Sequence, residues 1–224
     1  MRDATNPDRL RGFTLIELLI VIGILSMLLV VLVPQLVEGK QTARIHECGL
    51  RIEAAAAAAR AYESQRRFGD YPPDDFRDPD GTIKVPRDSV NPGIESFLVF
   101  LHRMDSREPG LSDHEDWFGN TDGDRSDTVL GRLDRKEKVE LLDPWGNPIA
   151  YFHHRNYGEE QTYRMGGGEE GDPEEAEEQV VQAWRTRDGR WFHPRSFQLF
   201  SAGPDGVFNT RDDVANFVIQ EEDD

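Results

Sequence analysis

The most constraining feature of this sequence is an almost unbroken apolar stretch at residues 13–33, which contains one ionisable side chain, Glu17. A helix of this length and apolarity is long enough to cross a hydrocarbon core about 30 Å thick. Arg2, Arg9 and Arg11 precede the stretch, and arginines beside a span favour the cytoplasm for that end. We therefore expect a membrane span with the N-terminus in the cytoplasm and the rest of the chain outside.

The junction in front of the span carries a recognisable motif. The apolar run ends at Pro34 and continues into polar helix-forming sequence, whereas a cleaved secretory signal ends at a small-residue cleavage site. Residues 12–18 read Gly-Phe-Thr-Leu-Ile-Glu-Leu, which resembles the prepilin cleavage and methylation motif of type IV pilins and type II secretion pseudopilins. The resemblance implies that a prepilin peptidase cleaves between Gly12 and Phe13, removes the cytoplasmic leader 1–12 and methylates the new amino terminus of Phe13.

Glu17 needs a separate explanation, because a carboxylate at the centre of a membrane helix costs about 2.5–3.5 kcal/mol on insertion scales. It lies four residues from Phe13, so it can sit near the cytoplasmic interface, where water lowers that cost. In the pilin family the matching glutamate neutralises the terminal ammonium of a neighbouring subunit. The resemblance therefore implies an assembly role for Glu17, as one half of an ion pair in low dielectric.

The helix is expected to continue to residue 67, because residues 38–67 contain strong helix formers, including six alanines at 54–59. An apolar set repeats at spacings of three and four, which predicts one buried face; it comprises Ile45, Cys48, Ile52, Ala55, Ala59 and Tyr62. Arg44, Arg51 and Arg60 fall off that face, so we expect them in water. Pro34 and Gly39 are expected points of kinking or local melting.

The remaining residues, 68–224, are enough for one globular domain. Residues 94–104 are expected to form a helix, and residues 149–154, 196–202 and 214–220 are expected to form strands. Together these elements predict an α+β pilin fold, with a long N-terminal helix that spans the membrane in its first half and packs on a small antiparallel sheet. The stretches 74–140 and 155–193 are expected to be long loop insertions. Within the second, residues 158–179 contain nine acidic residues and one arginine, which predicts a flexible surface loop.

A second signature lies near the C-terminus: Asp-Pro-Trp-Gly-Asn-Pro at 143–148, Ser-Ala-Gly-Pro-Asp-Gly at 201–206 and Asp-Asp-Val at 212–214. These segments resemble the major, G-type pseudopilin of type II secretion. The resemblance implies one structural calcium ion, bound by the side chains of Asp205, Asp212 and Asp213 and by the backbone carbonyls of Ala202 and Val207. Such hard oxygen donors suit calcium. The alternative is a plain turn followed by a solvated strand start.

Other candidate sites carry weaker signals. The acidic loop 120–127 partly matches an EF-hand loop, but its glycine is misplaced, so we expect a solvated loop. His153 and His154 are expected on opposite faces of a strand, where they would not share a metal. Cys48 is the only cysteine and is expected to pack in the core. No hydrolase, zinc-protease or phosphate-loop motif is present, so we do not expect an enzyme.

Two functions of different class remain after this reading. The first is a structural subunit of a type II secretion pseudopilus, anchored in the inner membrane and assembled into a periplasmic filament that drives protein export; a type IV pilin or a minor pseudopilin is a close variant. Its expected partners are identical subunits, other pseudopilins, the prepilin peptidase, the inner-membrane assembly platform and exported proteins. The second is a membrane-anchored calcium-binding module or enzyme. The net charge of −17 disfavours nucleic acid as a partner.

Overall fold

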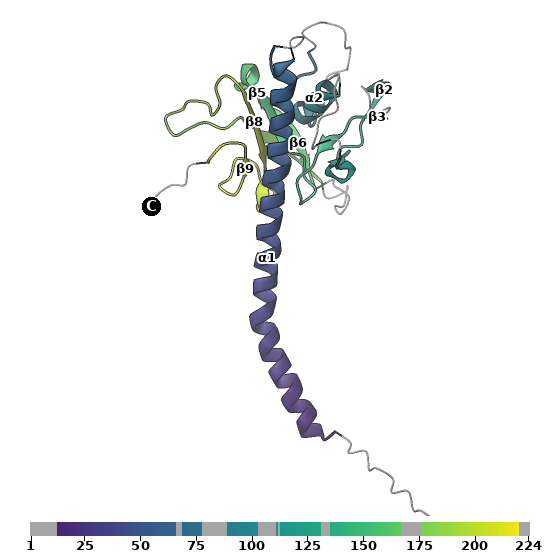
Figure 1. The fold of residues 1–224 in the computed structure, drawn as a ribbon, viewed down its shortest axis with the longest axis vertical. Helices are drawn as coiled ribbons and strands as arrows, with labels where there is room; N and C mark the ends of the chain where they lie inside the picture. The colour runs from purple at the N-terminus through teal and green to yellow at the C-terminus, as the bar shows by residue number, and fades with distance from the viewer. Residues whose placement is uncertain are drawn as a thin grey trace, which may run out of the picture. The chain divides into compact units, whose positions relative to one another are not determined.

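The structure is a computed structural model that describes residues 13–65, 69–77, 89–102, 111, 113–130, 135–166 and 176–219. The chain divides into two compact units, Met1–Thr42 and Ala43–Asp224. The leader 1–12, with Gly12, lies outside the described residues. Figure 1 shows one long helix, a short second helix and several short strands.

The long helix, α1, spans Leu15–Ser64. It continues without interruption through Pro34 and Gly39, so neither of these residues melts the helix. It ends three residues before the expected position 67, and residues 66–68 lie outside the described part. The N-terminal segment belongs to the first compact unit, and the segment from Ala43 onwards belongs to the second.

The part of α1 in the second unit is amphipathic, as the repeat of apolar residues predicts. Five residues of the repeat are at most 2% exposed, whereas Ile45 at its start is 39% exposed; the buried five are Cys48, Ile52, Ala55, Ala59 and Tyr62. Arg44 and Arg60 are exposed. The expectation for Arg51 was wrong: it is buried at 7% exposure, because its long side chain reaches across to Leu142, where a guanidinium nitrogen (NH1) donates to the carbonyl oxygen at 2.8 Å.

The second unit contains one further α-helix and short strands. In chain order these elements are α2 (Pro92–Leu101), η1 (Glu115–Trp117), β1 (Phe118–Gly119), β2 (Arg125–Leu130), β3 (Arg135–Glu137), β4 (Glu140–Leu141), β5 (Ala150–His153), η3 (His154–Asn156), β6 (Gln161–Met165), β7 (Glu177–Val181), β8 (Phe197–Ser201), η4 (Gly203–Asp205) and β9 (Val214–Ala215). The strands pair as β1 with β4, β2 with β3, β6 with β7, and β5-β8-β9 in a three-stranded sheet.

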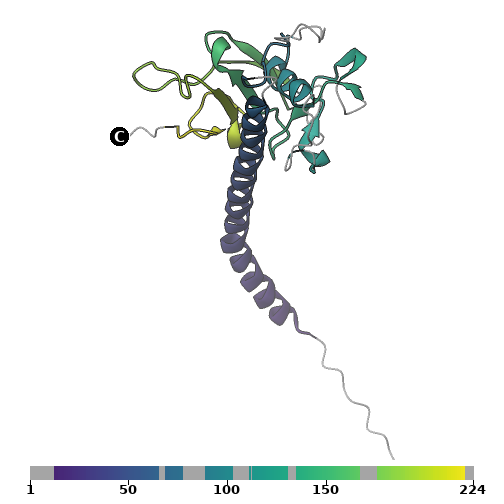
Figure 2. The same ribbon diagram turned by 45° about the horizontal axis from the view of Figure 1, so that its top comes forward.

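The three-stranded sheet forms from the three segments that the sequence predicts, although β9 covers only Val214–Ala215 of the strand expected at 214–220. Both of its pairings are antiparallel, with Tyr151 opposite Leu199 and Ser201 opposite Val214. Ile52 and Ala59 of α1 belong to the same core cluster as Leu199 of this sheet, and the C-terminal part of α1 runs beside the sheet in both views of the ribbon (Figures 1 and 2). The small alanine face of α1 permits this close approach, so the α+β prediction of a helix packed on an antiparallel sheet is confirmed for the second unit.

Aromatic side chains pack on both faces of the sheet. Phe97 of α2 packs on Tyr151 of β5 with ring centroids 4.6 Å apart, and on the opposite face Phe152 stacks on Phe200 at 5.9 Å. The hydroxyl of Tyr151 is fully buried and donates to the carbonyl oxygen of Pro72 at 2.7 Å. The predicted helix at 94–104 is confirmed, although it begins at Pro92 and ends at Leu101.

The two long insertions are more ordered than expected. The interpretation of 158–179 as a flexible loop was wrong for 161–165 and 177–179, which form the paired strands β6 and β7. Strand β6 alternates buried and half-buried residues, and its Tyr163 is fully buried in the core. The acidic composition concealed this alternation, and residues 167–175 lie outside the described part. Within 74–140, the strands β1–β4 likewise replace an expected loop.

Candidate functional site

The start of α1 is closed by hydrogen bonds between Thr14 and Glu17. The Oε2 atom of Glu17 accepts from the backbone N–H of Thr14 at 2.9 Å and from its hydroxyl at 2.8 Å. The backbone N–H of Glu17 in turn donates to the Thr14 hydroxyl at 3.3 Å. This reciprocal arrangement is a capping box, in which a Thr at the N-cap and a Glu three residues later satisfy the first free N–H groups of a helix. Glu17 therefore has a local role that the sequence interpretation missed.

The apolar residues that follow the capping box are exposed in the described part of the chain. The large apolar side chains within 13–33 whose burial the structure describes are between 42% and 88% exposed, at Val21 and Leu15 respectively. Phe13, the expected first residue after processing, is 76% exposed. Among the described residues, no helix meets the criteria of length and apolarity for crossing a membrane.

The C-terminal loop after β8 is folded around glycine and aspartate. Gly203 has a φ of +66°, and a Cβ at this position would lie 2.2 Å from the carbonyl oxygen of Asp212. The backbone N–H of Asp205 donates to Oδ2 of Asp212 at 3.1 Å, and the N–H of Val207 donates to Oδ1 of Asp205 at 2.8 Å. Glycine is thus required at 203, and the loop brings Asp205 and Asp212 together.

The hydroxyl of Thr210 lies at the centre of this loop, among acceptors. Its oxygen is 3.1 Å from Oδ2 of Asp205, 2.5 Å from Oδ1 of Asp212 and 3.2 Å from the carbonyl oxygen of Val207. A hydroxyl has one proton to donate, so three acceptors share one donor. The acceptors are carboxylate and carbonyl oxygens, the donor types that calcium prefers.

Asp213 is placed differently from the other two predicted ligands. Its Oδ2 accepts from the indole N–H of Trp184 and from the backbone N–H of Asn209, both at 3.0 Å, and its Oδ1 accepts from the N–H of Thr210 at 3.3 Å. Burial raises the pKa of Asp213 to about 7. Its carboxylate therefore anchors the loop to Trp184. Of the two residues whose backbone carbonyls are expected as ligands, Ala202 is buried and Val207 is exposed.

The Asp-Pro-Trp-Gly turn is joined directly to this loop. Oδ1 of Asp143 accepts from the backbone N–H of Trp145 at 2.9 Å and of Asn147 at 3.0 Å, which fixes the turn. Its Oδ2 accepts from the hydroxyl of Ser201 at 2.6 Å, and Ser201 in turn accepts from the N–H of Gly203 at 3.0 Å. Burial raises the pKa of Asp143, while the hydrogen bond from Ser201 opposes this shift. The two segments of the C-terminal signature thus form one connected unit.

His153 and His154 lie side by side, contrary to expectation. Their ring centroids are 4.3 Å apart, because β5 ends at His153 and the 3₁₀ turn η3 begins at His154, so strand alternation does not apply. Ligand atoms of both histidines and of Asp70 lie within 4.8 Å of one another. However, Asp70 already pairs with Arg155, and Nδ1 of His153 accepts from the N–H of Arg155 at 3.3 Å. Contacts with Arg155 therefore already engage Asp70 and His153 of this cluster.

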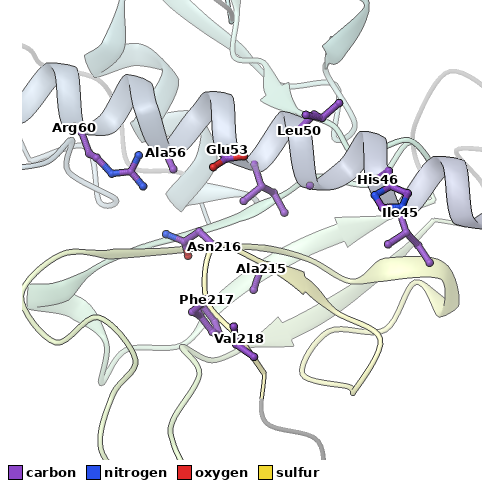
Figure 3. A pocket seen from close by; sticks show the side chains of 12 residues that line it. Ile45, His46, Leu50, Glu53, Ala56, Arg60, Ala215, Asn216, Phe217 and Val218 are labelled. Carbon is purple, nitrogen blue, oxygen red and sulfur yellow. The ribbon is translucent and has the colours of Figure 1, made fainter.

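A groove of about 500 Å³ runs between α1 and the segment that follows β8. Figure 3 shows α1 passing over residues 215–218. Its lining combines apolar and polar side chains, including Leu50, Glu53, Arg60, Asn216 and Val218. The residues that line the groove include neither serine nor cysteine.

Comparison with known proteins agrees with both sequence signatures. Residues 9–33 match the family model described as the prokaryotic N-terminal methylation motif. The chain is 29% identical over 161 residues to the type II secretion system core protein G of Pseudomonas aeruginosa, a match that covers 71% of this chain and 86% of that protein. No solved structure matches. The methylation motif and the similarity over most of the chain show that this protein resembles type IV pilin-like proteins, among them the pseudopilins of type II secretion.

Proposed function

We propose that this chain is a structural subunit of a type II secretion pseudopilus. The proposal rests on the uncovered apolar surface of residues 13–33, which begins at a capped helix terminus bearing Glu17. Apolar surface of this extent is stable only when it is removed from water. Lipid would cover it before assembly, with the helix anchored in the inner membrane, and the same helix of neighbouring subunits would cover it in a periplasmic filament.

Processing is the first test of this proposal. A prepilin peptidase that reads the Gly12-Phe13 junction would leave N-methyl-Phe13 as the first residue. Mass spectrometry of the protein extracted from membranes of its host, or of cells that express a prepilin peptidase, measures this directly. An intact Met1, or a new terminus beyond Pro34, would contradict the assignment to a pseudopilus and favour an ordinary membrane-anchored module.

Assembly is the second test, and the capping box decides which variants to use. In the proposed filament, the Glu17 carboxylate pairs with the terminal ammonium of a neighbouring subunit. Glutamine can also complete a capping box, so Glu17→Gln keeps the cap and removes the charge, whereas Glu17→Ala removes both. If the charge drives assembly, both variants lose filaments; if the cap is the only role, Glu17→Gln assembles like the parent.

Cysteine cross-linking can report this assembly with little background. Cys48 is the only cysteine of the chain and is fully buried, so a second cysteine in the exposed apolar segment would be the reactive one. Leu28→Cys is suitable, because Leu28 is 52% exposed. Cross-linked multimers should form in cells with the secretion machinery and disappear in both Glu17 variants. Equal multimer yields in parent and Glu17→Gln would refute the role of the charge.

We also propose that the loop 203–213 binds one structural calcium ion. The support is the set of acceptors around Thr210, in which the carboxylates of Asp205 and Asp212 and the carbonyl of Val207 share one hydroxyl proton. Asp205, Asp212 and Asp213, with the carbonyls of Ala202 and Val207, would supply the oxygens. The ion would hold the loop that follows β8 against the Asp143 turn.

Calcium should raise the thermal unfolding midpoint of the full chain in mild detergent. Ligand at a hundred times Kd stabilises by about 2.7 kcal/mol, which for a chain of this size is a shift of about 5–10 °C. Asp205→Ala with Asp212→Ala should reduce the shift between calcium and chelator. Glu159→Gln with Asp188→Asn removes the same charge from exposed positions and should leave it intact. If Asp205→Ala with Asp212→Ala leaves the calcium-dependent shift unchanged, calcium binds elsewhere in the chain.

A further inference from the structure

A second group of carboxylates is buried far from the C-terminal signature in the sequence. Glu95 on α2, Asp122 in the loop between β1 and β2, and Glu140 on β4 each place an oxygen within 4.8 Å of the other two. Glu95 and Glu140 are fully buried. Calcium binds oxygens at about 2.3–2.6 Å, so opposite ligands of one ion are about 5 Å apart. The spacing of the three oxygens is therefore suited to a single shared ion.

Glu140 is held in place by its neighbours on both oxygens. Its Oε1 accepts from the side-chain amide of Asn91 at 3.0 Å, and its Oε2 accepts from the backbone N–H of Thr121 at 2.9 Å. The same amide of Asn91 donates to the hydroxyl of Thr121 at 2.9 Å. Each carboxylate oxygen has a second lone pair, so these bonds orient Glu140 and leave it able to bind a metal, as outer-sphere partners do in metal sites.

Glu95 is the observation that points to a ligand. Its side chain is fully buried, and among the described residues neither of its carboxylate oxygens has a hydrogen-bond partner. The ammonium of Lys138 approaches Oε2 at 3.5 Å and also pairs with Asp124. A buried carboxylate without hydrogen bonds is costly, and here it faces two other carboxylates.

The three carboxylates repel one another when all are ionised, because their oxygens lie within 4.8 Å of one another and two of the side chains are fully buried. Burial, and after it the charge of Asp124, raises the pKa of Glu95. Two states would relieve this repulsion: protons on the buried carboxyls, or a cation between them.

We propose that Glu95, Asp122 and Glu140 bind a hard divalent cation, with calcium as the best fit, at a site separate from the loop 203–213. All three side-chain donors are carboxylate oxygens, the donor type preferred by calcium and magnesium over softer metals. The three ligands come from α2, the β1–β2 loop and β4, so the ion would tie three segments of the 74–140 region together. In the loop 120–127, which was expected to be solvated, Thr121 is buried at 6% exposure, whereas Gly123 and Arg125 are exposed.

Metal stoichiometry separates the two proposed sites. The full chain in mild detergent is dialysed against calcium, or against magnesium, and the bound metal is measured by mass spectrometry. The variant Asp205→Ala with Asp212→Ala should retain one calcium ion, and Glu95→Gln with Asp122→Asn should lose it in that background. If the first variant binds neither calcium nor magnesium at millimolar concentration, or if the second pair does not reduce the metal bound, the site is refuted.

Thermal unfolding distinguishes a loss of metal binding from a loss of folding. Glu95→Gln replaces a charge by an amide that can donate to Asp122 or Glu140, so in chelator it should unfold at or above the parent temperature. In calcium the order should reverse, because the parent gains the ion and the variant does not. If Glu95 is instead a buried, protonated carboxyl that binds no ion, parent and variant will show the same order of unfolding temperatures in chelator and in calcium. That result would overturn the proposal.

Lys138→Met provides an independent measurement. Removing the competing ammonium should tighten calcium binding by at least about tenfold, since one positive charge next to the ion is lost. Calcium should also restore the unfolding temperature that this substitution lowers. This measurement is made in the Asp205→Ala with Asp212→Ala background, so that calcium at the loop 203–213 does not contribute. If unfolding of Lys138→Met in that background does not depend on calcium or magnesium, no cation binds at the cluster.

Discussion

Arg51 is the cation that joins the C-terminal part of α1 to the rest of the second unit. Its NH1 group donates to the carbonyl of Leu142 at 2.8 Å in a buried position. Its guanidinium carbon lies 5.3 Å from the centre of the Trp117 ring, and it pairs with Glu47 one turn earlier on the helix at 2.5 Å. We predict that Arg51→Ala strongly destabilises the second unit.

The magnitude follows from these contacts. A hydrogen bond from a charged donor contributes about 1.5–3 kcal/mol, a cation–π contact about 0.5–1 kcal/mol, and an i,i+4 ion pair about 0.3–0.5 kcal/mol. Because the three contacts share one group, they do not add independently. The expected loss for Arg51→Ala is therefore about 2–4 kcal/mol, with an intermediate loss for Arg51→Lys, whose ammonium lacks the planar fork.

Urea unfolding of the full chain in mild detergent can measure this loss. All four tryptophans, at 117, 145, 184 and 191, lie in the second unit, so tryptophan fluorescence reports on that unit alone. The midpoint is compared, because the substitution also changes the environment of Trp117. Arg44→Ala removes an exposed arginine from the same helix and should change stability by no more than about 0.5 kcal/mol. If Arg51→Ala lowers the unfolding midpoint no more than Arg44→Ala does, the contacts of Arg51 with Leu142 and Trp117 do not stabilise the second unit.

Two further predictions use the same assay. Gly93→Ala should destabilise severely, because a Cβ there would lie 2.2 Å from the carbonyl oxygen of Tyr151, whereas Gly49→Ala in α1 meets no atom within 4 Å and should stabilise by about 0.5–1 kcal/mol; effects of the same sign would contradict the packing at Gly93. Burial lowers the pKa of His153 from 6.5 to about 4, so between these values the unfolded chain binds a proton that the folded chain does not, and stability falls as the pH falls. Between about pH 6 and pH 4 the parent should lose up to about 1.4 kcal/mol per pH unit relative to His153→Gln, and parallel pH curves would show that His153 does not titrate in this way.

Local sequence signals were sufficient for the sheet. The strands expected at 149–154, 196–202 and 214–220 correspond to β5, β8 and β9 in one antiparallel sheet. Each was bounded by turn residues such as those at 143–148, and the turn chemistry depends on nearby residues alone. The same holds for α2, whose apolar residues repeat within ten positions.

Features that depend on distant partners were missed. Periodicity places Arg51 at the edge of the buried face of α1, but its burial depends on the Leu142 carbonyl, 91 residues away in sequence. The Glu95 cluster combines residues 95, 122 and 140 from three elements. No local pattern at any one of these positions indicates the other two. The strand β6 did carry a local signal, since Gln161, Tyr163 and Met165 alternate with less buried residues. The acidic residues around it favoured the prediction of a flexible loop instead.

The capping box and the proposed ion pair of Glu17 are compatible, because they can use different oxygens of one carboxylate. Both hydrogen bonds from Thr14 go to Oε2, and among the described residues Oε1 accepts no hydrogen bond. The cap fixes the side chain at the first turn of α1, which lowers the conformational entropy lost when a second partner binds. The sequence Thr-x-x-Glu thus places a charged acceptor at the end of an exposed apolar helix, where the ammonium of a neighbouring subunit could reach it. In the proposed filament Glu17→Asp, which keeps the charge but shortens the side chain, should assemble less well than the parent.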